Sequence, residues 1–148
     1  MNLMDSSNES MVFRQMILDH YENPINKKID DDVINTYSKY NYKSESCIDN
    51  LTVYLKIENN IVRDARFDGI GCAISTSSTD ILCEMIKNKN KNEIKLILDN
   101  YFSMINSEPY DQTIIGDLKI FKNVNQQLNR IKCALVGVNS IKNIIDSN

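Results

Sequence analysis

The stretch FDGIGCAISTSST, residues 67–79, decides the fold that the rest of this sequence predicts. Its pattern indicates a strand that runs through two glycines into a helix, because glycine allows backbone conformations that are closed to other residues. Cys72 then falls in the first helical turn, where unpaired amide groups and the helix dipole favour a thiolate over a thiol. A thiolate binds metals and attacks sulfur, whereas many free cysteines are small buried hydrophobic residues. Both interpretations stay open on this stretch alone.

The residues before this stretch predict an antiparallel sheet. Apolar and polar residues alternate over residues 51–58, which is the period of a half-buried strand. Asn59 and Asn60 suit a tight turn into a second strand over residues 61–67. Residues 33–42 are rich in Val, Ile, Thr and Tyr and predict a further strand. The three strands form an antiparallel meander, and its last strand leads to Cys72.

Helical periodicity predicts the remaining elements. An N-terminal helix over residues 12–21 ends before Pro24, since the residue that precedes a proline avoids the helical region. We expect residues 1–10 to be a flexible N-terminus, and further helices over residues 72–88, 94–105 and 127–145. The mixed region 106–127 predicts a short helical turn between loops. The sequence therefore predicts a single α+β domain, residues 1–148, with a three-stranded sheet covered by helices.

Composition excludes several classes of function. Of the 148 residues, 42% are hydrophobic and 25% are charged, and the net charge is −3. With no basic surplus, we expect neither nucleic acid nor a membrane surface as the main partner. No apolar run is long enough to span a membrane and no secretory signal is recognisable, so we expect a cytoplasmic protein. In that reducing compartment, four cysteines indicate metal binding, thiol chemistry or core packing rather than disulfides.

Two residues with metal-binding chemistry favour a structural interpretation. Cys83 follows Cys72 by eleven residues, or about 16 Å along one helix, so the two thiols cannot bind the same ion. The apolar neighbours of Cys83 place it in the core. His20 is the only histidine, and we favour a partly buried residue that packs near the turn ending its helix over a metal ligand.

The other three cysteines and an aspartate form a candidate ligand set. Cys133 points away from the apolar stripe of the last helix, and the cationic neighbours Arg130 and Lys132 would lower the pKa of its thiol. Cys47 and Asp49 lie two apart in an extended segment, so their side chains project to the same side. The alternative is a loop cysteine beside a solvated aspartate. Together these residues make four ligands, which is the number that a tetrahedral zinc site needs. Two come from a loop and one comes from the start of each of two helices. Spacing alone does not show that the segments meet. The full set is Cys47, Asp49, Cys72 and Cys133.

Four segments resemble the IscU/SufU family of iron-sulfur cluster assembly proteins, which has a SufE/IscU/NifU-like fold. They are DHYENP at 19–24, CID at 47–49, FDGIGCAIS at 67–75 and RIKCA at 130–134, and they stand in family order. Two features resemble the zinc-binding SufU branch. These are the gap of 60 residues between Cys72 and Cys133, with an insertion over residues 106–127, and Lys132 in place of the histidine of IscU scaffolds. Ile48 departs from the family, which has a glycine there.

The resemblance implies both a site and a function. It implies that Cys47, Asp49, Cys72 and Cys133 bind Zn²⁺, and that Cys47 accepts persulfide sulfur from a pyridoxal-phosphate-dependent cysteine desulfurase of the SufS type. Sulfur then passes to downstream cluster-assembly proteins, so the chain is a sulfurtransferase-like acceptor rather than a stand-alone enzyme. Two alternatives stay open. One is a scaffold that binds iron or builds a transient [2Fe-2S] cluster on the same ligands, and the other is a structural zinc or interaction module without sulfur transfer.

Overall fold

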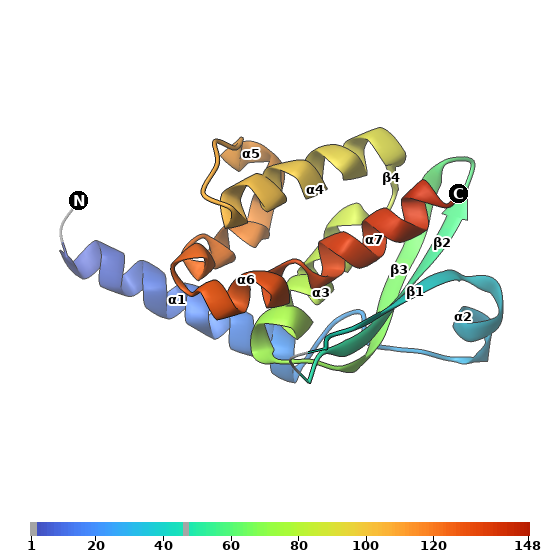
Figure 1. The fold of residues 1–148 in the computed structure, drawn as a ribbon, viewed down its shortest axis with the longest axis horizontal. Coiled ribbons are helices and arrows are strands. Elements are labelled where there is room, and N and C mark those ends of the chain that lie inside the picture. The colour runs from blue at the N-terminus through green and yellow to red at the C-terminus, as the bar shows by residue number, and fades with distance from the viewer. Residues whose placement is uncertain (1–2, 46–47) are drawn as a thin grey trace.

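The computed structural model of the chain describes residues 3–45 and 48–148 (Figure 1). The strands are β1 (Ser38–Lys43), β2 (Asn50–Glu58), β3 (Ile61–Ile70) and β4 (Lys89–Asn90). The α-helices are α1 (Leu3–Glu22), α2 (Asp31–Thr36), α3 (Ala73–Ile86), α4 (Lys91–Ile105), α5 (Gln112–Ile115), α6 (Leu128–Ala134) and α7 (Val136–Asp146). Two 3-10 helices, η1 (Gly116–Phe121) and η2 (Val124–Gln126), lie between α5 and α6.

The sheet is antiparallel with the strand order β1-β2-β3-β4. The α+β class and the meander of the first three strands are confirmed, but the expected number of three strands is wrong. The fourth strand, β4, pairs its two residues with the start of β3. A strand of two residues shows no alternation of apolar and polar side chains, and this is why the sequence pattern did not reveal it.

The strand predicted over residues 33–42 is also wrong in its first half. The structure has helix α2 there, and β1 begins only at Ser38. Asp30 caps α2, because its side chain accepts a hydrogen bond of 3.0 Å from the amide of Val33. Asp31 and Asp32 add negative charge to the first turn, where the helix dipole favours it. These capping interactions outweigh the strand preference of the residues that follow.

The turn between β2 and β3 and the end of β3 follow the prediction. Asn59 and Asn60 both have positive φ, at 53° and 64°, as a tight hairpin turn requires. Gly69 has a φ of 121°, and a Cβ atom at this position would overlap the carbonyl oxygen of Asn50 on the neighbouring strand. Only glycine fits this place, so the chain can pass close to β2 and turn into α3.

One hydrophobic core lies between the sheet and the helices. Leu51, Val53 and Leu55 on β2 are fully buried, whereas the residues between them are only half-buried. Helices α3 and α7 cover the buried face of the sheet, α1 packs against α3, and α4 lies against α7 (Figure 1). None of the helices in the described ranges is long and apolar enough to cross a membrane.

The N-terminal helix starts earlier than the sequence pattern indicated. Residues 3–10, expected as part of a flexible N-terminus, belong to α1. Glu9 in this part of α1 forms an ion pair with Lys122, which also lies over the ring of Phe13 at 5.4 Å from its centroid. The helix is thus held by a residue more than a hundred positions away, which local periodicity cannot indicate.

The region 106–127, expected as one short helical turn between loops, contains the short helices α5, η1 and η2. Leu118, Ile120 and Phe121 bury their side chains in the core. The last helix, predicted as one element over residues 127–145, is instead divided at Leu135 into α6 and α7. The apolar stripe continues across the break, and therefore periodicity did not show it.

Candidate metal centre

Asp49, Cys72 and Cys133 meet at one end of the sheet. One ligand atom of each lies within 4.8 Å of the others. Asp49 precedes β2, Cys72 precedes α3, and Cys133 lies in the last turn of α6. In Figure 1, the first turn of α3 lies beside α6 and the ends of the strands. The structure thus places three of the four predicted ligands together, and the fourth, Cys47, lies outside the described residues.

Cys72 is the N-cap residue of α3, one position before the turn in which the sequence analysis placed it. Its sulfur accepts a hydrogen bond of 3.4 Å from the amide of Ser75. Gly71 makes this entry possible, because a Cβ atom there would come within 2.5 Å of the Ser75 hydroxyl oxygen. The sulfur atom therefore lies where the first turn of α3 presents its unpaired amide groups.

The Asp49 carboxylate is buried, with 2% of the residue exposed, and α3 holds it in place. Its Oδ1 accepts hydrogen bonds from the backbone amide of Cys72 at 3.0 Å and from the hydroxyl of Ser75 at 2.9 Å. A carboxylate has a further oxygen and further lone pairs. Two donors on Oδ1 fix the orientation of the group and leave Oδ2 as the oxygen with capacity for a cation.

The thiol of Cys133 has a pKa raised to about 12. Burial is the largest cause, and the neighbouring Cys72 and Asp49 side chains add to it. The expectation that Arg130 and Lys132 lower this pKa is wrong, since both side chains are exposed to solvent while the thiol faces acidic groups. A divalent cation between these three groups would replace the thiol proton and remove the repulsion.

The three donors fit a zinc ion in chemistry and spacing. Zinc binds thiolate and carboxylate groups in a tetrahedron, with ligand atoms about 3.8 Å apart for zinc–sulfur distances of about 2.3 Å. The ligand atoms lie within 4.8 Å of one another, which is about 1 Å more than that value at most. A fourth ligand is needed, and Cys47 lies two residues before Asp49 in the chain.

The position of Cys133 differs from expectation. Cys133 lies in the last turn of α6 rather than at the start of a helix. It reaches the site because α6 ends one residue later and the chain turns at Leu135.

The structural interpretation of Cys83 and His20 agrees with their positions. Cys83 is fully buried in the core, and burial raises the pKa of its thiol. The Nδ1 atom of His20 lies 2.6 Å from Oδ2 of Asp80, a fully buried carboxylate on α3. Asp80 also accepts hydrogen bonds from the backbone amides of Ile25 and Asn26, at 3.1 and 2.8 Å. His20 therefore belongs to the contact that holds the end of α1 and the following turn against α3.

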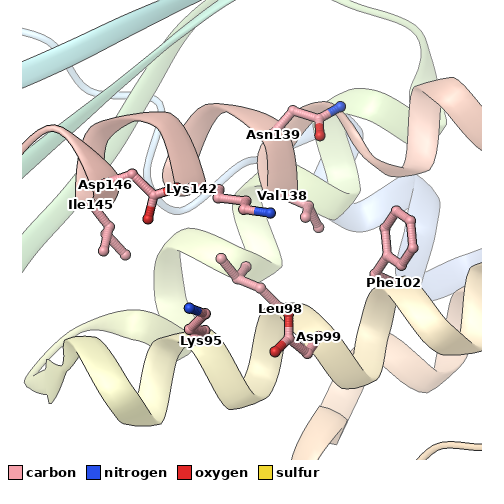
Figure 2. Close-up of a pocket in the computed structure, with 9 residues that line it drawn as sticks. All are labelled: Lys95, Leu98, Asp99, Phe102, Val138, Asn139, Lys142, Ile145 and Asp146. Carbon is pink, nitrogen blue, oxygen red and sulfur yellow. The ribbon is translucent and has the colours of Figure 1, made fainter.

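The site opens to solvent at a surface with exposed apolar side chains. Ile48, Ile70 and Leu128 are 68%, 67% and 81% exposed. Ile48 and Leu128 line the depression that contains the three ligands, together with Arg130 and Lys132. A separate cavity of about 210 Å³ lies between α4 and α7, and none of the candidate ligands lines it (Figure 2). The three candidate ligands thus lie in the depression and not in this cavity.

Comparison with known proteins decides the family. The sequence matches the family model of the NifU-like N-terminal domain over residues 12–134. The chain belongs to this family. The match covers the segments that carry the resemblance seen in the sequence, which is therefore confirmed.

Relatives of this NifU-like domain include two kinds of protein. The zinc-dependent sulfurtransferase SufU of Bacillus subtilis is 35% identical over 131 residues, which are 87% of this chain and 86% of that protein. The iron-sulfur cluster assembly scaffold protein IscU of Thermotoga maritima is 28% identical over 133 residues, or 89% and 91%. A crystal structure from Fervidobacterium islandicum, described as a cluster assembly scaffold for the SUF system, has a TM-score of 0.81 and 25% identity, and covers 91% of this chain and 97% of that chain.

Ser75 and Asp80 are two residues near the site whose roles were not predicted from the sequence. Both are completely buried polar residues on α3, which carries a run of hydroxyl residues at positions 75–79. Polar residues that are buried need hydrogen-bond partners, and these partners come from other segments. A run of Ser and Thr that continues into Asp on a predicted core helix was the available signal.

Proposed function

We propose that this chain is a zinc-dependent sulfur carrier in iron-sulfur cluster assembly in the cytoplasm. It takes persulfide sulfur from a pyridoxal-phosphate-dependent cysteine desulfurase at Cys47 and passes it to downstream assembly proteins. The observation that carries the proposal is the convergence of Asp49, Cys72 and Cys133, of which Asp49 follows Cys47 by two positions in the sequence. The similarity to a protein named as a zinc-dependent sulfurtransferase supports it.

Cys47, Asp49, Cys72 and Cys133 would hold the zinc ion, which keeps thiols deprotonated and protected until a partner arrives. The chain's own contacts prepare the site. The Cys72 amide and the Ser75 hydroxyl orient the Asp49 carboxylate, and the burial of Cys133 excludes water from one side.

The sulfur transfer is an exchange between a thiolate and a persulfide. The Cys47 thiolate attacks the terminal sulfur of the desulfurase persulfide, and a new sulfur–sulfur bond forms on Cys47. The sulfur–sulfur bond of the donor breaks, and the donor cysteine leaves as a thiolate with the electron pair. No outside oxidant or reductant is needed, because the terminal sulfur keeps its oxidation state while it moves.

The surface around the site suits a desulfurase partner with an apolar contact bordered by acidic groups. Ile48, Ile70 and Leu128 are large exposed apolar side chains beside a reactive centre, which is where a partner must approach. Arg130 and Lys132 line the same depression and supply positive charge. Ile48 lines this depression, and Cys47 directly precedes it in the sequence.

The test is sulfur transfer from a cysteine desulfurase with isotope-labelled cysteine, followed by intact-mass and peptide measurement. The proposal expects one labelled sulfur atom on Cys47 and stimulation of the desulfurase. Cys47→Ser should abolish both, whereas Cys83→Ser, which changes a buried core thiol, should accept sulfur like the unmodified chain. Labelled sulfur on another residue would refute Cys47 as the acceptor, and no labelled sulfur at all would refute the carrier role.

The similarity to IscU of Thermotoga maritima favours a second candidate, a scaffold that assembles a [2Fe-2S] cluster on the same ligands. Anaerobic reconstitution that yields a stable cluster spectrum, without stimulation of a desulfurase, would select the scaffold. A structural zinc module differs from both, because Cys47→Ser would then lower the free energy of unfolding as its main effect.

A further inference from the structure

The side chain of Tyr101 links α4 to the segment that carries Cys133. Tyr101 is fully buried, and its hydroxyl donates a hydrogen bond of 2.9 Å to the backbone carbonyl of Ala134. Ala134 directly follows Cys133 and is the last residue of α6. Carbonyls at the end of a helix have no partner within the helix, so an outside donor is needed here. Tyr101 is that donor.

The ring of Tyr101 is itself held by the region 106–127. The ring of Phe121 in η1 packs edge-on against it, with the centroids 6.2 Å apart and the planes at 69°. Burial raises the pKa of the Tyr101 hydroxyl, so it stays protonated and remains a donor. The contacts therefore run without a gap from η1 through Tyr101 to the residue after Cys133.

Helices α6 and α7 join at Leu135, and on the side away from Tyr101 this α6–α7 junction packs against α3, the helix that begins after Cys72. A Cβ atom on Gly137 would come within 3.3 Å of the Cα atom of Thr79, so α7 and α3 are in close backbone contact. By contrast, α4 and α7 are separated along part of their length by the cavity shown in Figure 2. The hydrogen bond from Tyr101 is thus a localised contact that fixes the α6–α7 junction from the side of α4.

We propose that Tyr101 is a positioning residue for the metal centre, and that the region 106–127 supports it through Phe121. The hydroxyl holds the Ala134 carbonyl and so sets the distance between the sulfur atoms of Cys133 and Cys72. The proposal rests on the proposed function in one respect, since it takes Cys133 as a ligand. It assigns a role to the region 106–127 that does not involve contact with the ion or with a partner.

The test measures metal binding by the isolated full chain, with Co²⁺ as a spectroscopic probe and Zn²⁺ in competition with a chromophoric chelator. Tyr101→Phe removes only the hydroxyl and keeps the ring contact with Phe121. Ser140→Ala is the matched control, because the buried Ser140 hydroxyl donates a 2.9 Å hydrogen bond to the Val136 carbonyl on α7. Both variants lose one buried hydroxyl that donates to a carbonyl, and urea unfolding compares their stability.

We expect Tyr101→Phe to weaken Zn²⁺ binding about tenfold or more, the usual effect of removing a group that orients a ligand. The thiolate-to-cobalt bands should also weaken or shift, whereas Ser140→Ala should retain the affinity and spectrum of the unmodified chain. If Tyr101→Phe does not yield folded protein, Phe121→Leu, which keeps the hydroxyl but removes the ring contact, should show a smaller change in the same direction.

Equal affinities and spectra for Tyr101→Phe and Ser140→Ala would overturn the positioning role while leaving the proposed function intact. Failure of the unmodified chain to bind either metal would refute both. The measurement contains no desulfurase and reports only metal binding. A chain that binds metal normally but does not accept sulfur would therefore give neither of these two results.

Discussion

Replacement of Ser75 by alanine tests whether the hydrogen bond from Ser75 orients the Asp49 carboxylate for metal binding. The Ser75 hydroxyl is completely buried and donates a 2.9 Å hydrogen bond to Oδ1 of Asp49. A hydrogen bond to a charged group contributes about 1.5–3 kcal/mol, and the 2% exposure of Asp49 leaves little room for water to replace the lost donor. We therefore expect Ser75→Ala to lower the free energy of unfolding of the metal-free chain by about that amount.

The loss of metal-binding free energy should be smaller than the full free energy of the hydrogen bond, because the bond is present both with and without the ion. What the variant loses is the fixed orientation of the carboxylate, and removal of such orienting groups costs about 10- to 100-fold in affinity. The remaining donor on Oδ1, the Cys72 amide, still restrains Asp49. We therefore expect a loss of about tenfold, at the lower end of that range.

Ser77→Ala is the control for this variant. Ser77 lies on the same helix, is equally buried, and its hydroxyl donates to the carbonyl of Ala73 rather than to Asp49. Zinc affinity is measured by competition with a chromophoric chelator, and stability by urea unfolding. If both variants bind zinc equally well, the hydrogen bond from Ser75 does not prepare Asp49 for a cation and the reasoning is wrong.

Three further predictions concern the framework and are measured by urea unfolding. Gly69→Ala should destabilise the chain by about 2 kcal/mol or more, since φ is 121° and a Cβ atom would overlap the Asn50 carbonyl; a change below about 0.5 kcal/mol, typical of neutral surface sites, would contradict this. Asp80→Ala should cost about 3–5 kcal/mol, because it leaves His20 and two backbone amides without their acceptor, and a neutral result would show that the buried contact is dispensable. Burial and the hydrogen bond to Asp64 raise the pKa of Tyr37 from 10.0 to about 12. The contribution of the protonated Tyr37 hydroxyl to the free energy of unfolding should therefore be complete below pH 10 and be lost as the pH rises to about 12. Tyr37→Phe should reduce this dependence of the free energy of unfolding on pH.

Local patterns predicted the parts of the fold that local forces determine. The alternation over residues 51–58, the Asn59-Asn60 turn and the glycine that leads into α3 each depend on side-chain period or backbone freedom. The helix α2 was missed because one capping aspartate, Asp30, outweighs the strand preference of its neighbours. The break at Leu135 was missed because it depends on contacts with α3 and α4, which a continuous apolar stripe does not reveal.

The site shows the same division. The glycines, Cys72 and the candidate ligand set could be recognised from the sequence, and the resemblance to a family implied that the four residues bind one zinc ion. The environment of Cys133 could not be predicted, because Arg130 and Lys132 are its neighbours in sequence, whereas Cys72 and Asp49 are its neighbours in space. The pKa of a thiol depends on the groups that are close to it in space. The partners of His20 and Ser75 are likewise distant in sequence.

The central claim is that distant segments hold one zinc ion through thiolates and a carboxylate. X-ray absorption at the zinc edge of the purified full chain tests it most directly. We predict three sulfur atoms at about 2.3 Å and one oxygen at about 2.0–2.2 Å from zinc, with the sulfur count falling by one in Cys133→Ser. A coordination shell of only nitrogen and oxygen atoms, or one that does not change in Cys133→Ser, would contradict the account.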